Sequence, residues 1–252
     1  MRTVIIVQAR MTSSRLPGKV LMPIAGRPML EQQLRRLRGC RMAQEIAIAT
    51  TTNASDDPVA EIAWKQGCSL FRGSEYDVLG RYVGAARKAC ADVVVRVTAD
   101  CPLIDAGVTD RVIQELLDRS DRCDYASNVL QRTWPRGLDV EAFFMDTLLR
   151  MDRLGRSPQA REHVTVGPRL EHPEVFLCHS VQDTRNNADL RWTVDTIQDL
   201  HLVRTIYEEL GLDERLLAYP EILAWVRSRT DLVNLNRGIE TWDPHAELAR
   251  TR

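Results

Sequence analysis

Three basic side chains, Arg10, Arg15 and Lys19, occur in one short polar stretch directly after an apolar run at residues 4–7. The stretch reads QARMTSSRLPGK, and the first acidic residue of the chain is Glu31. Arginine offers forked donors and lysine a compact charge, while backbone N–H groups can surround the remaining oxygens of a phosphate group. This combination predicts a loop that binds a nucleoside triphosphate, although three cations alone would also suit a solvated surface loop.

The stretch matches neither of the two common phosphate-binding loops. In a Walker A loop, Ser13 would be a glycine, and the residue after Lys19 would be serine or threonine instead of Val20. No Gly-x-Gly-x-x-Gly follows the apolar run, which removes the main sequence support for a dinucleotide site.

Two carboxylates follow other predicted strands. Asp100 comes just after the apolar run 93–97, and Asp195 follows a strand expected at 190–194. Ligands of parallel α/β sheets bind at the carboxyl ends of the strands, so Asp100 could hold Mg²⁺ on nucleotide phosphates. An Asx turn before Pro102 explains Asp100 equally well. Asp195 could be a helix N-cap, and it becomes a metal ligand only if it lies beside Asp100.

Two further polar clusters occur in the second half of the chain. The segment RGLDVE carries Arg136, Asp139 and Glu141, with the two acids on one face of an expected strand. The segment REHVT carries Arg161 and His163 within about one helical turn. Alone, these clusters would be an exposed strand face and a polar helix end. No serine or cysteine nucleophile motif accompanies the histidine, so nucleophilic catalysis has no support.

The spacing of the apolar residues predicts the strands and helices that hold these polar groups in place. Strand-like and helix-like segments alternate in the first half, which is typical of a mostly parallel sheet with right-handed crossovers. We expect one doubly wound α/β domain with a small antiparallel excursion, divided into a nucleotide half at about 1–120 and a second half at about 121–252. The expected strands are 3–8, 44–50, 68–71, 92–97, 123–127, 138–144, 175–181 and 190–194. The expected helices are 28–38, 57–66, 77–91, 145–154, 158–170, 196–210 and 219–228.

Composition narrows the class of protein. The chain has 252 residues, 27% charged and 44% apolar, with a formal net charge of −1, so it has no general attraction for nucleic acid or anionic membranes. Its six cysteines lack metal-binding spacing and are expected to be reduced, mostly buried thiols of a cytoplasmic protein. No apolar run approaches the ~20 residues needed to span a bilayer. The first strand starts at residue 3, which leaves no room for a signal peptide.

Taken together, the polar blocks resemble a known family. The first loop looks like the nucleotide-binding signature of the sugar cytidylyltransferases, which include the CMP-Kdo and CMP-acylneuraminate synthetases. The SpsF-like spore-coat polysaccharide biosynthesis branch resembles the chain more. Its other elements are echoed, in order, by FRGSEYDVLGRY at 71–82, DCPLID at 100–105, GLDVE at 137–141, REHVT at 161–165 and TVD at 193–195. The resemblance covers roughly residues 4–205.

The resemblance implies a Rossmann-like nucleotidyltransferase fold of the GT-A type, CTP as the donor, Mg²⁺ as the cofactor, and a small acidic acceptor such as a sugar acid. It implies a homodimer, with the second half providing the acceptor pocket and the dimer contacts. It implies that Lys19, Arg10 and Asp100 are catalytic residues and that Asp100 and Asp195 are the metal ligands. The implied nucleotide-binding residues are Gln8, Ala9, Arg10, Arg15, Lys19, Ser74, Asp77 and Arg81. The implied acceptor-binding residues are Arg136, Asp139, Glu141, Arg161 and His163.

The chain departs from the family pattern at two positions. Ala99 stands where glycine is usual before the metal aspartate, and Thr193 replaces the first acid of the Asp-x-Asp often found in acylneuraminate synthetases. A second metal is therefore not expected. Residues from about 230 match no acceptor pattern. Two other functions stay open: a glycosyltransferase that uses a nucleotide sugar, disfavoured by the triphosphate loop, and a non-catalytic nucleotide-binding protein, disfavoured by the two carboxylates.

Overall fold

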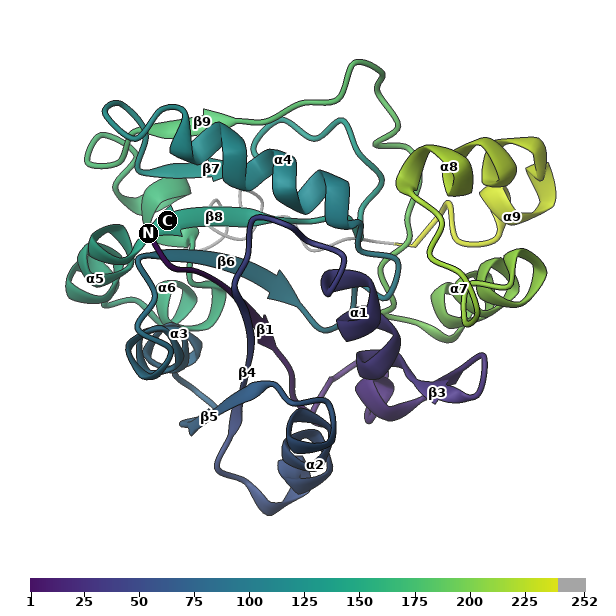
Figure 1. Cartoon of the computed structure of the whole chain (residues 1–252), viewed down its shortest axis with the longest axis horizontal. Coiled ribbons are helices and arrows are strands. Elements are labelled where there is room, and N and C mark those ends of the chain that lie inside the picture. Colours follow the sequence, from purple (N-terminus) through teal and green to yellow (C-terminus); the bar gives the residue numbers. More distant parts are fainter. Residues whose placement is uncertain (240–252) are drawn as a thin grey trace.

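A seven-stranded sheet runs through the protein in the order β5-β4-β1-β6-β8-β7-β9 (Figure 1). The computed structural model describes residues 1–239. The sheet strands are β1 Thr3–Gln8, β4 Glu45–Thr51, β5 Ser69–Gly73, β6 Val93–Thr98, β7 Tyr125–Ser127, β8 Glu141–Phe144 and β9 Cys178–Ser180.

Strand pairing confirms a mostly parallel sheet with an antiparallel part. Strands β5, β4, β1 and β6 are parallel to one another, whereas β8 runs antiparallel to both β6 and β7. Strand β9 is parallel to β7, and β2 (Pro23–Ile24) with β3 (Arg27–Pro28) forms a separate antiparallel pair. Because β8 pairs with β6, the sheet continues from the first half of the chain into the second. The carboxyl ends of the parallel strands all lie at one edge of this sheet.

The alternation of apolar residues in β1 explains why helices cover both faces. Ile5 and Val7 pack in one buried cluster, and Val4 and Ile6 pack in another. Helices α1 (Met29–Leu37), α2 (Asp57–Lys65), α4 (Ala106–Leu117), α7 (Ile197–Leu210) and α8 (Tyr219–Ser228) contribute to the first cluster. Helices α3 (Val78–Lys88) and α5 (Met145–Leu154) contribute to the second, and α6 (Pro158–His163) contacts α3. The short helix α9 (Thr230–Asn234) follows α8.

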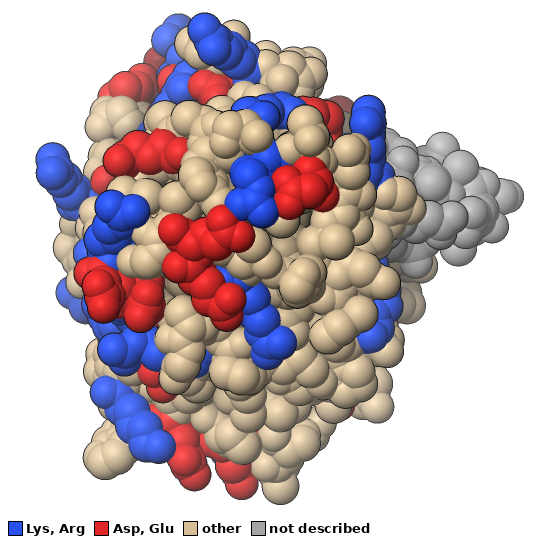
Figure 2. All heavy atoms as spheres, turned by 90° about the vertical axis from the view of Figure 1, so that its right-hand side faces the viewer, with Lys and Arg blue, Asp and Glu red and all other residues tan. Residues whose placement is uncertain are grey.

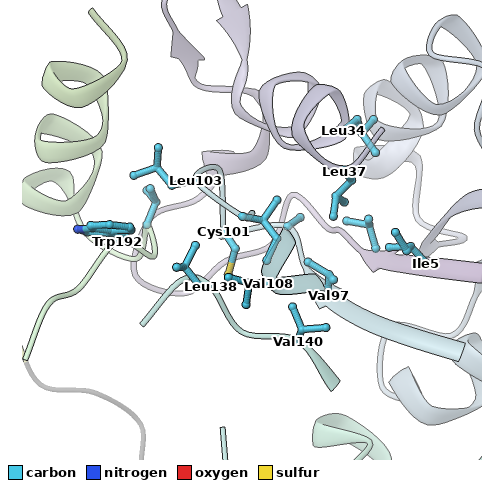
Figure 3. Close-up of a cluster of buried hydrophobic side chains, with 14 of the residues drawn as sticks. Ile5, Leu34, Leu37, Val97, Cys101, Leu103, Val108, Leu138, Val140 and Trp192 are labelled. Carbon is cyan, nitrogen blue, oxygen red and sulfur yellow. The ribbon is translucent and has the colours of Figure 1, made fainter. Parts of the chain in front are cut away.

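The first buried cluster continues beneath the loop that follows β6. Figure 3 shows it extending from Ile5 and Leu34 through Val97 and Cys101 to Trp192. Cys101 directly follows Asp100, so close packing beneath this loop fixes the backbone that carries the carboxylate.

Two of the expected elements differ from the observed ones, and one observed helix was not expected. The segment 190–194 is not a strand, because Trp192 and Thr193 donate their backbone N–H groups to the carbonyl of Arg136, and only an isolated bridge forms there. The helix expected at 158–170 ends at His163, because Val164 has a φ of 52°, and a short π-helical turn follows at Gly167–Glu171. Helix α4 was not expected, although its buried apolar positions have helical spacing and Asp105 caps its start.

The expectation that the cysteines are mostly buried is corrected in part. Of the six cysteines, all free, only Cys101 and Cys123 are buried, and Cys90 and Cys178 are exposed.

Within residues 1–239, every helix is too short or too polar to cross a bilayer. On the side carrying α7 and α8, acidic and basic side chains are interspersed (Figure 2), in keeping with the small net charge.

Candidate active site at the carboxyl ends of the parallel strands

The basic loop after β1 is closed around one backbone carbonyl. The oxygen of Met11 accepts hydrogen bonds from the N–H groups of Ser13 (3.0 Å) and Gly18 (2.9 Å). Gly18 has a φ of 72°, a conformation that glycine adopts without steric cost. The chain then enters a 3₁₀ turn at Lys19–Leu21, which turns Lys19 inward and leaves it only 8% exposed. The loop is thus a tight turn that buries its lysine.

The ammonium group of Lys19 lies between the two predicted metal ligands. Its Nζ is 3.1 Å from Oδ2 of Asp100 and 2.9 Å from Oδ1 of Asp195. It also donates to the backbone oxygen of Val194 at 2.8 Å. Asp100 and Asp195 therefore lie close together, which the sequence left open.

Asp100 is held by its neighbours at the end of β6. The hydroxyl of Thr98 donates to Oδ1 of Asp100 at 2.5 Å, and the N–H of Val194 donates to its backbone oxygen at 2.8 Å. Burial acts to raise the pKa of Asp100, but the charge of Lys19 and the hydrogen bond from Thr98 outweigh it and lower the pKa to about 2. Burial likewise acts to lower the pKa of Lys19, but the two carboxylates raise it above its ordinary value. Both partners are therefore charged at neutral pH.

Asp195 is held from the other side by two arginines. Its Oδ1 is 2.9 Å from Arg15, and its Oδ2 is 2.7 Å from Arg191. Arg191 in turn pairs with the buried Asp199 at 2.9 Å. Thr196, not Asp195, is the N-cap of α7, so helix capping does not account for Asp195.

A glycine turn brings the segment of Asp195 to the end of β6. Gly137 has a φ of 109°, and a Cβ built there would lie 2.5 Å from the backbone nitrogen of Thr193. Only glycine lets the backbone at position 137 pack this closely against Trp192 and Thr193. The glycine of the RGLDVE segment is thus explained by backbone contact.

Two cavities open at this site. The larger one has a volume of about 480 Å³ and is lined by residues that include Gln8, Arg10, Arg15, Lys19, Asp100 and His163. The smaller one has a volume of about 150 Å³ and is lined by residues that include Arg15, Asp100, Arg136, Asp139, Arg191 and Asp195. Arg15 and Asp100 belong to both linings, and Lys19 of the larger cavity pairs with Asp195 of the smaller one, so these groups lie where the two cavities meet.

Four of the predicted nucleotide-binding residues lie outside the linings of both cavities. Ala9 is buried, and its N–H donates to the oxygen of Ala49 at 3.2 Å. The buried Arg81 donates to the backbone oxygens of Ser74 (2.7 Å) and Glu75 (3.1 Å), and burial lowers its pKa. The carboxylate of Asp77 caps α3, and it also accepts from Arg161 at 2.8 Å. Ser74, Asp77 and Arg81 therefore shape the loop between β5 and α3.

The predicted acceptor residues differ in how much of their hydrogen-bonding capacity is free. Arg161 pairs with Asp77 at 2.5 Å and with Asp152 at 2.7 Å. Asp139 receives two hydrogen bonds from Arg132, at 2.5 and 2.8 Å. Within the part of the chain that the structure describes, the Arg136 guanidinium makes no hydrogen bond or ion pair, and burial lowers its pKa. Of these three side chains, Arg136 has free donors facing the smaller cavity.

We expected Glu141 to share a strand face with Asp139, but β8 begins only at Glu141, and the Glu141 side chain is buried. It accepts from Tyr125 at 2.6 Å, from Thr165 at 2.7 Å, and from Arg96. Burial acts to raise the pKa of Glu141, but the charge of Arg96 outweighs it and the pKa is lowered.

Sequence reasoning missed several residues that support the site, among them Arg191, Arg132, Arg96 and Asp56. Arg96 lines the larger cavity and reaches Oε1 of Gln8 at 3.4 Å. The signal was present, because a charged residue interrupts the apolar run of a buried strand. Asp56 accepts a hydrogen bond from the N–H of Met11 at 2.7 Å, which no sequence pattern indicated.

Comparisons with known proteins agree with this geometry. A family model described as cytidylyltransferase matches residues 4–208. The spore coat polysaccharide biosynthesis protein SpsF of Bacillus subtilis is 32% identical over 213 residues, covering 82% of this chain and 86% of SpsF.

Solved structures show the same fold. A cytidylyltransferase from Leptospira borgpetersenii serovar Hardjo-bovis superposes with a TM-score of 0.88 at 32% identity, over 96% of this chain and all of that one. A CMP:2-keto-3-deoxy-manno-octonic acid synthetase complexed with CTP has the same fold, with a TM-score of 0.64 at 20% identity, over 83% of this chain and 99% of that one. The resemblance to the sugar cytidylyltransferases is confirmed: the chain belongs to the cytidylyltransferase family and is a nucleotidyltransferase.

Proposed function

We propose that the protein transfers CMP from CTP to a small acidic acceptor and releases pyrophosphate. The observation that carries the proposal is the position of Lys19, Asp100 and Asp195 where a basic cavity meets a smaller second cavity. One cavity can then hold the nucleotide and the other the acceptor, with the reacting groups between them.

The larger cavity suits a nucleoside triphosphate. Its volume falls within the ~300–1,000 Å³ typical of small-molecule sites, and Arg10, Arg15, Lys19 and Arg96 supply positive charge along its wall. CTP is the nucleotide proposed here because the family model describes a cytidylyltransferase. Gln8 lines the same cavity, and its carboxamide supplies a further polar contact.

A single Mg²⁺ fits the carboxylate pair by its donor set. Asp100, Asp195 and the Val194 carbonyl present hard oxygen atoms around one position, which a cation already fills, namely the Lys19 ammonium. Among residues 1–239 no cluster of three or more His, Cys, Asp or Glu side chains could hold a metal. Asp100 and Asp195 would therefore hold the ion together with water and phosphate oxygens. Bound there, Mg²⁺ would neutralise developing charge on the phosphates.

The acceptor is an acid recognised by Arg136. Its guanidinium faces the smaller cavity with free donors, and forked N–H groups match carboxylate or phosphate oxygens. The donors of Arg161 already bind Asp77 and Asp152, so this arginine has a structural role and holds these two carboxylates. Asp139 lines the smaller cavity and pairs with Arg132, and His163 lines the nucleotide cavity. Glu141 is a positioning residue, because it contacts Thr165 and Arg96 and not the acceptor.

The reaction is an in-line displacement at the α-phosphorus. An acceptor oxygen forms the new bond to phosphorus while the bond to the bridging oxygen of pyrophosphate breaks. The protein would align the two reactants and stabilise charge, with Lys19 and Arg10 binding the departing pyrophosphate. Arg136 would hold the acceptor acid so that its nucleophilic oxygen reaches the phosphorus.

We also propose that the chain is a single nucleotidyltransferase domain. The pairing of β8 with β6 supports this, and the smaller cavity combines Arg15 and Asp100 from the first half with Arg136 and Asp195 from the second. Residues 240–252 lie outside the described part of the chain. The homodimer and the cytoplasmic location remain predictions.

The test is pyrophosphate release from each of the four nucleoside triphosphates with Mg²⁺, against sugar acids, amino acids, phosphonates and sugar phosphates. Release with CTP that depends on one acceptor class supports the proposal. Transfer of a sugar from a nucleotide sugar, without pyrophosphate release, would favour the glycosyltransferase. CTP binding without turnover on any acceptor would favour a non-catalytic nucleotide-binding protein.

A further inference from the structure

The buried Lys19 ammonium is surrounded by three oxygen atoms. These are Oδ2 of Asp100 at 3.1 Å, the backbone oxygen of Val194 at 2.8 Å, and Oδ1 of Asp195 at 2.9 Å. A lysine ammonium has three N–H donors and no acceptor, so this set matches its full capacity. The same three atoms are hard, partly anionic oxygen ligands of the kind that bind Mg²⁺.

We propose that in the nucleotide-free protein the Lys19 ammonium occupies the position of the divalent cation and must leave it before the cation binds. The inference rests on the proposed role of Asp100 and Asp195 as metal ligands. Two cations within contact distance of the same oxygens repel each other strongly in a partly buried site. The two states therefore exclude each other: either Lys19 or the metal ion neutralises the carboxylates.

This exclusion couples metal binding to nucleotide binding. A metal ion that enters alone forces Lys19 to give up three hydrogen bonds in a buried position, which is costly without a new partner. Lys19 also lines the larger cavity, where the triphosphate would supply new acceptors. Metal and nucleotide therefore favour each other's binding, and each raises the affinity of the other by the same factor. The free enzyme should bind the metal ion weakly.

The test uses Mn²⁺ as the probe, with free Mn²⁺ measured by electron paramagnetic resonance in the absence of nucleotide. Lys19→Met keeps the length of the side chain and removes the ammonium. We expect its Mn²⁺ affinity to exceed that of the wild type by about tenfold or more, because the apparent affinity scales with the vacant fraction of the site. The double variant Lys19→Met/Asp100→Asn should lose this gain.

A matched control distinguishes two effects of Lys19→Met: emptying the cation position and removing one positive charge from its surroundings. Arg136→Met removes one positive charge from the same region, but Arg136 makes no ion pair with either carboxylate. It should raise Mn²⁺ affinity much less than Lys19→Met does. Equal gains in the two variants would show a general electrostatic effect and would overturn the inference.

A second measurement uses the wild-type protein and does not depend on a variant that folds. The chain has three lysines, and Lys65 and Lys88 are exposed references for the buried Lys19. Saturating Mn²⁺ without nucleotide should speed acetylation of Lys19 relative to both references, as measured by mass spectrometry. An unchanged ratio, with Mn²⁺ bound through Asp100, would overturn the inference and leave the proposed function intact. Failure of Mn²⁺ to bind even with CTP would instead overturn the metal assignment itself.

Discussion

The carboxylate of Asp56 accepts a hydrogen bond of 2.7 Å from the backbone N–H of Met11. Asp56 is fully buried, and the Thr51 hydroxyl donates to its other oxygen. The Met11 carbonyl in turn accepts the N–H groups of Ser13 and Gly18. The turn before α2 thus holds the loop that carries the predicted triphosphate ligands, so Asp56 is a positioning residue.

Removing this contact should weaken nucleotide binding more than turnover. Asp56→Ala leaves the Met11 N–H without its partner, which costs about 1–3 kcal/mol of stability. We expect KM for CTP to rise about tenfold with a smaller change in kcat. Asp56→Asn keeps an oxygen acceptor and should restore most of the affinity. A purely structural role would lower stability in both variants and leave KM unchanged.

Substitution of Arg136 should affect the acceptor and spare the nucleotide. Arg136→Ala is expected to lower kcat/KM for the acceptor by about 10²-fold, the scale of one charge-assisted pair at about 3 kcal/mol, while the Kd for CTP stays the same. Arg136→Lys should recover only part of the loss, because lysine lacks the forked geometry. Steady-state kinetics and calorimetry give the two values. Equal losses for both substrates would remove Arg136 from acceptor recognition.

Gly137→Ala should be strongly destabilising because its Cβ meets backbone. The nearest atom is the nitrogen of Thr193 at 2.5 Å, and φ is 109°. Backbone strain of this kind costs on the order of 1–3 kcal/mol before any clash is counted. Gly67→Ala is the matched control, since Gly67 has a φ of 64° but nothing within 4 Å of the built Cβ. Urea unfolding should show the larger loss at Gly137, and comparable losses would argue against the close approach.

The pairing of Lys19 with Asp100 predicts how stability depends on pH. The pKa of Asp100 is lowered to about 2, below the ~3.9 of an unperturbed aspartate. The contribution of its charge is therefore fully present above pH ~4 and is lost as the pH falls toward 2. Asp100→Asn should destabilise the protein at pH 7 and progressively less between pH 4 and 2. Unfolding measured at these pH values tests this, and a constant difference would contradict the assigned pKa.

Much of the fold was predictable because it depends on continuous apolar patterns. The buried strands β1 and β6 coincide with the runs at Val4–Val7 and Val93–Val95, and the loops after them carry Arg10 and Asp100 as expected. The segment with Trp192 and Val194 has the alternation of a strand, but its N–H groups donate to Arg136 and Asp100 instead of a sheet neighbour. Local pattern cannot show such a distant partner.

The convergence of the site was less predictable for the same reason. Asp195 lies beside Asp100 because the backbone oxygen of Asp100 accepts from the Val194 N–H and the Thr193 hydroxyl, contacts that join segments far apart in the chain. Asp56 supports the loop through one backbone hydrogen bond, and such a contact leaves no periodic signal. Arg96 was detectable in principle, as a charge within an apolar strand.

The most direct test of cytidylyl transfer follows the α-phosphate of CTP. The protein is incubated with Mg²⁺, an acidic acceptor and CTP labelled at the α-phosphorus, and the products are separated. Cytidylyl transfer should place the label in a CMP–acceptor ester with the wild type, with a loss of about 10²-fold or more for Lys19→Ala and for Asp100→Asn. Label that stays in CTP for every acceptor, or appears only as free CMP, would contradict it.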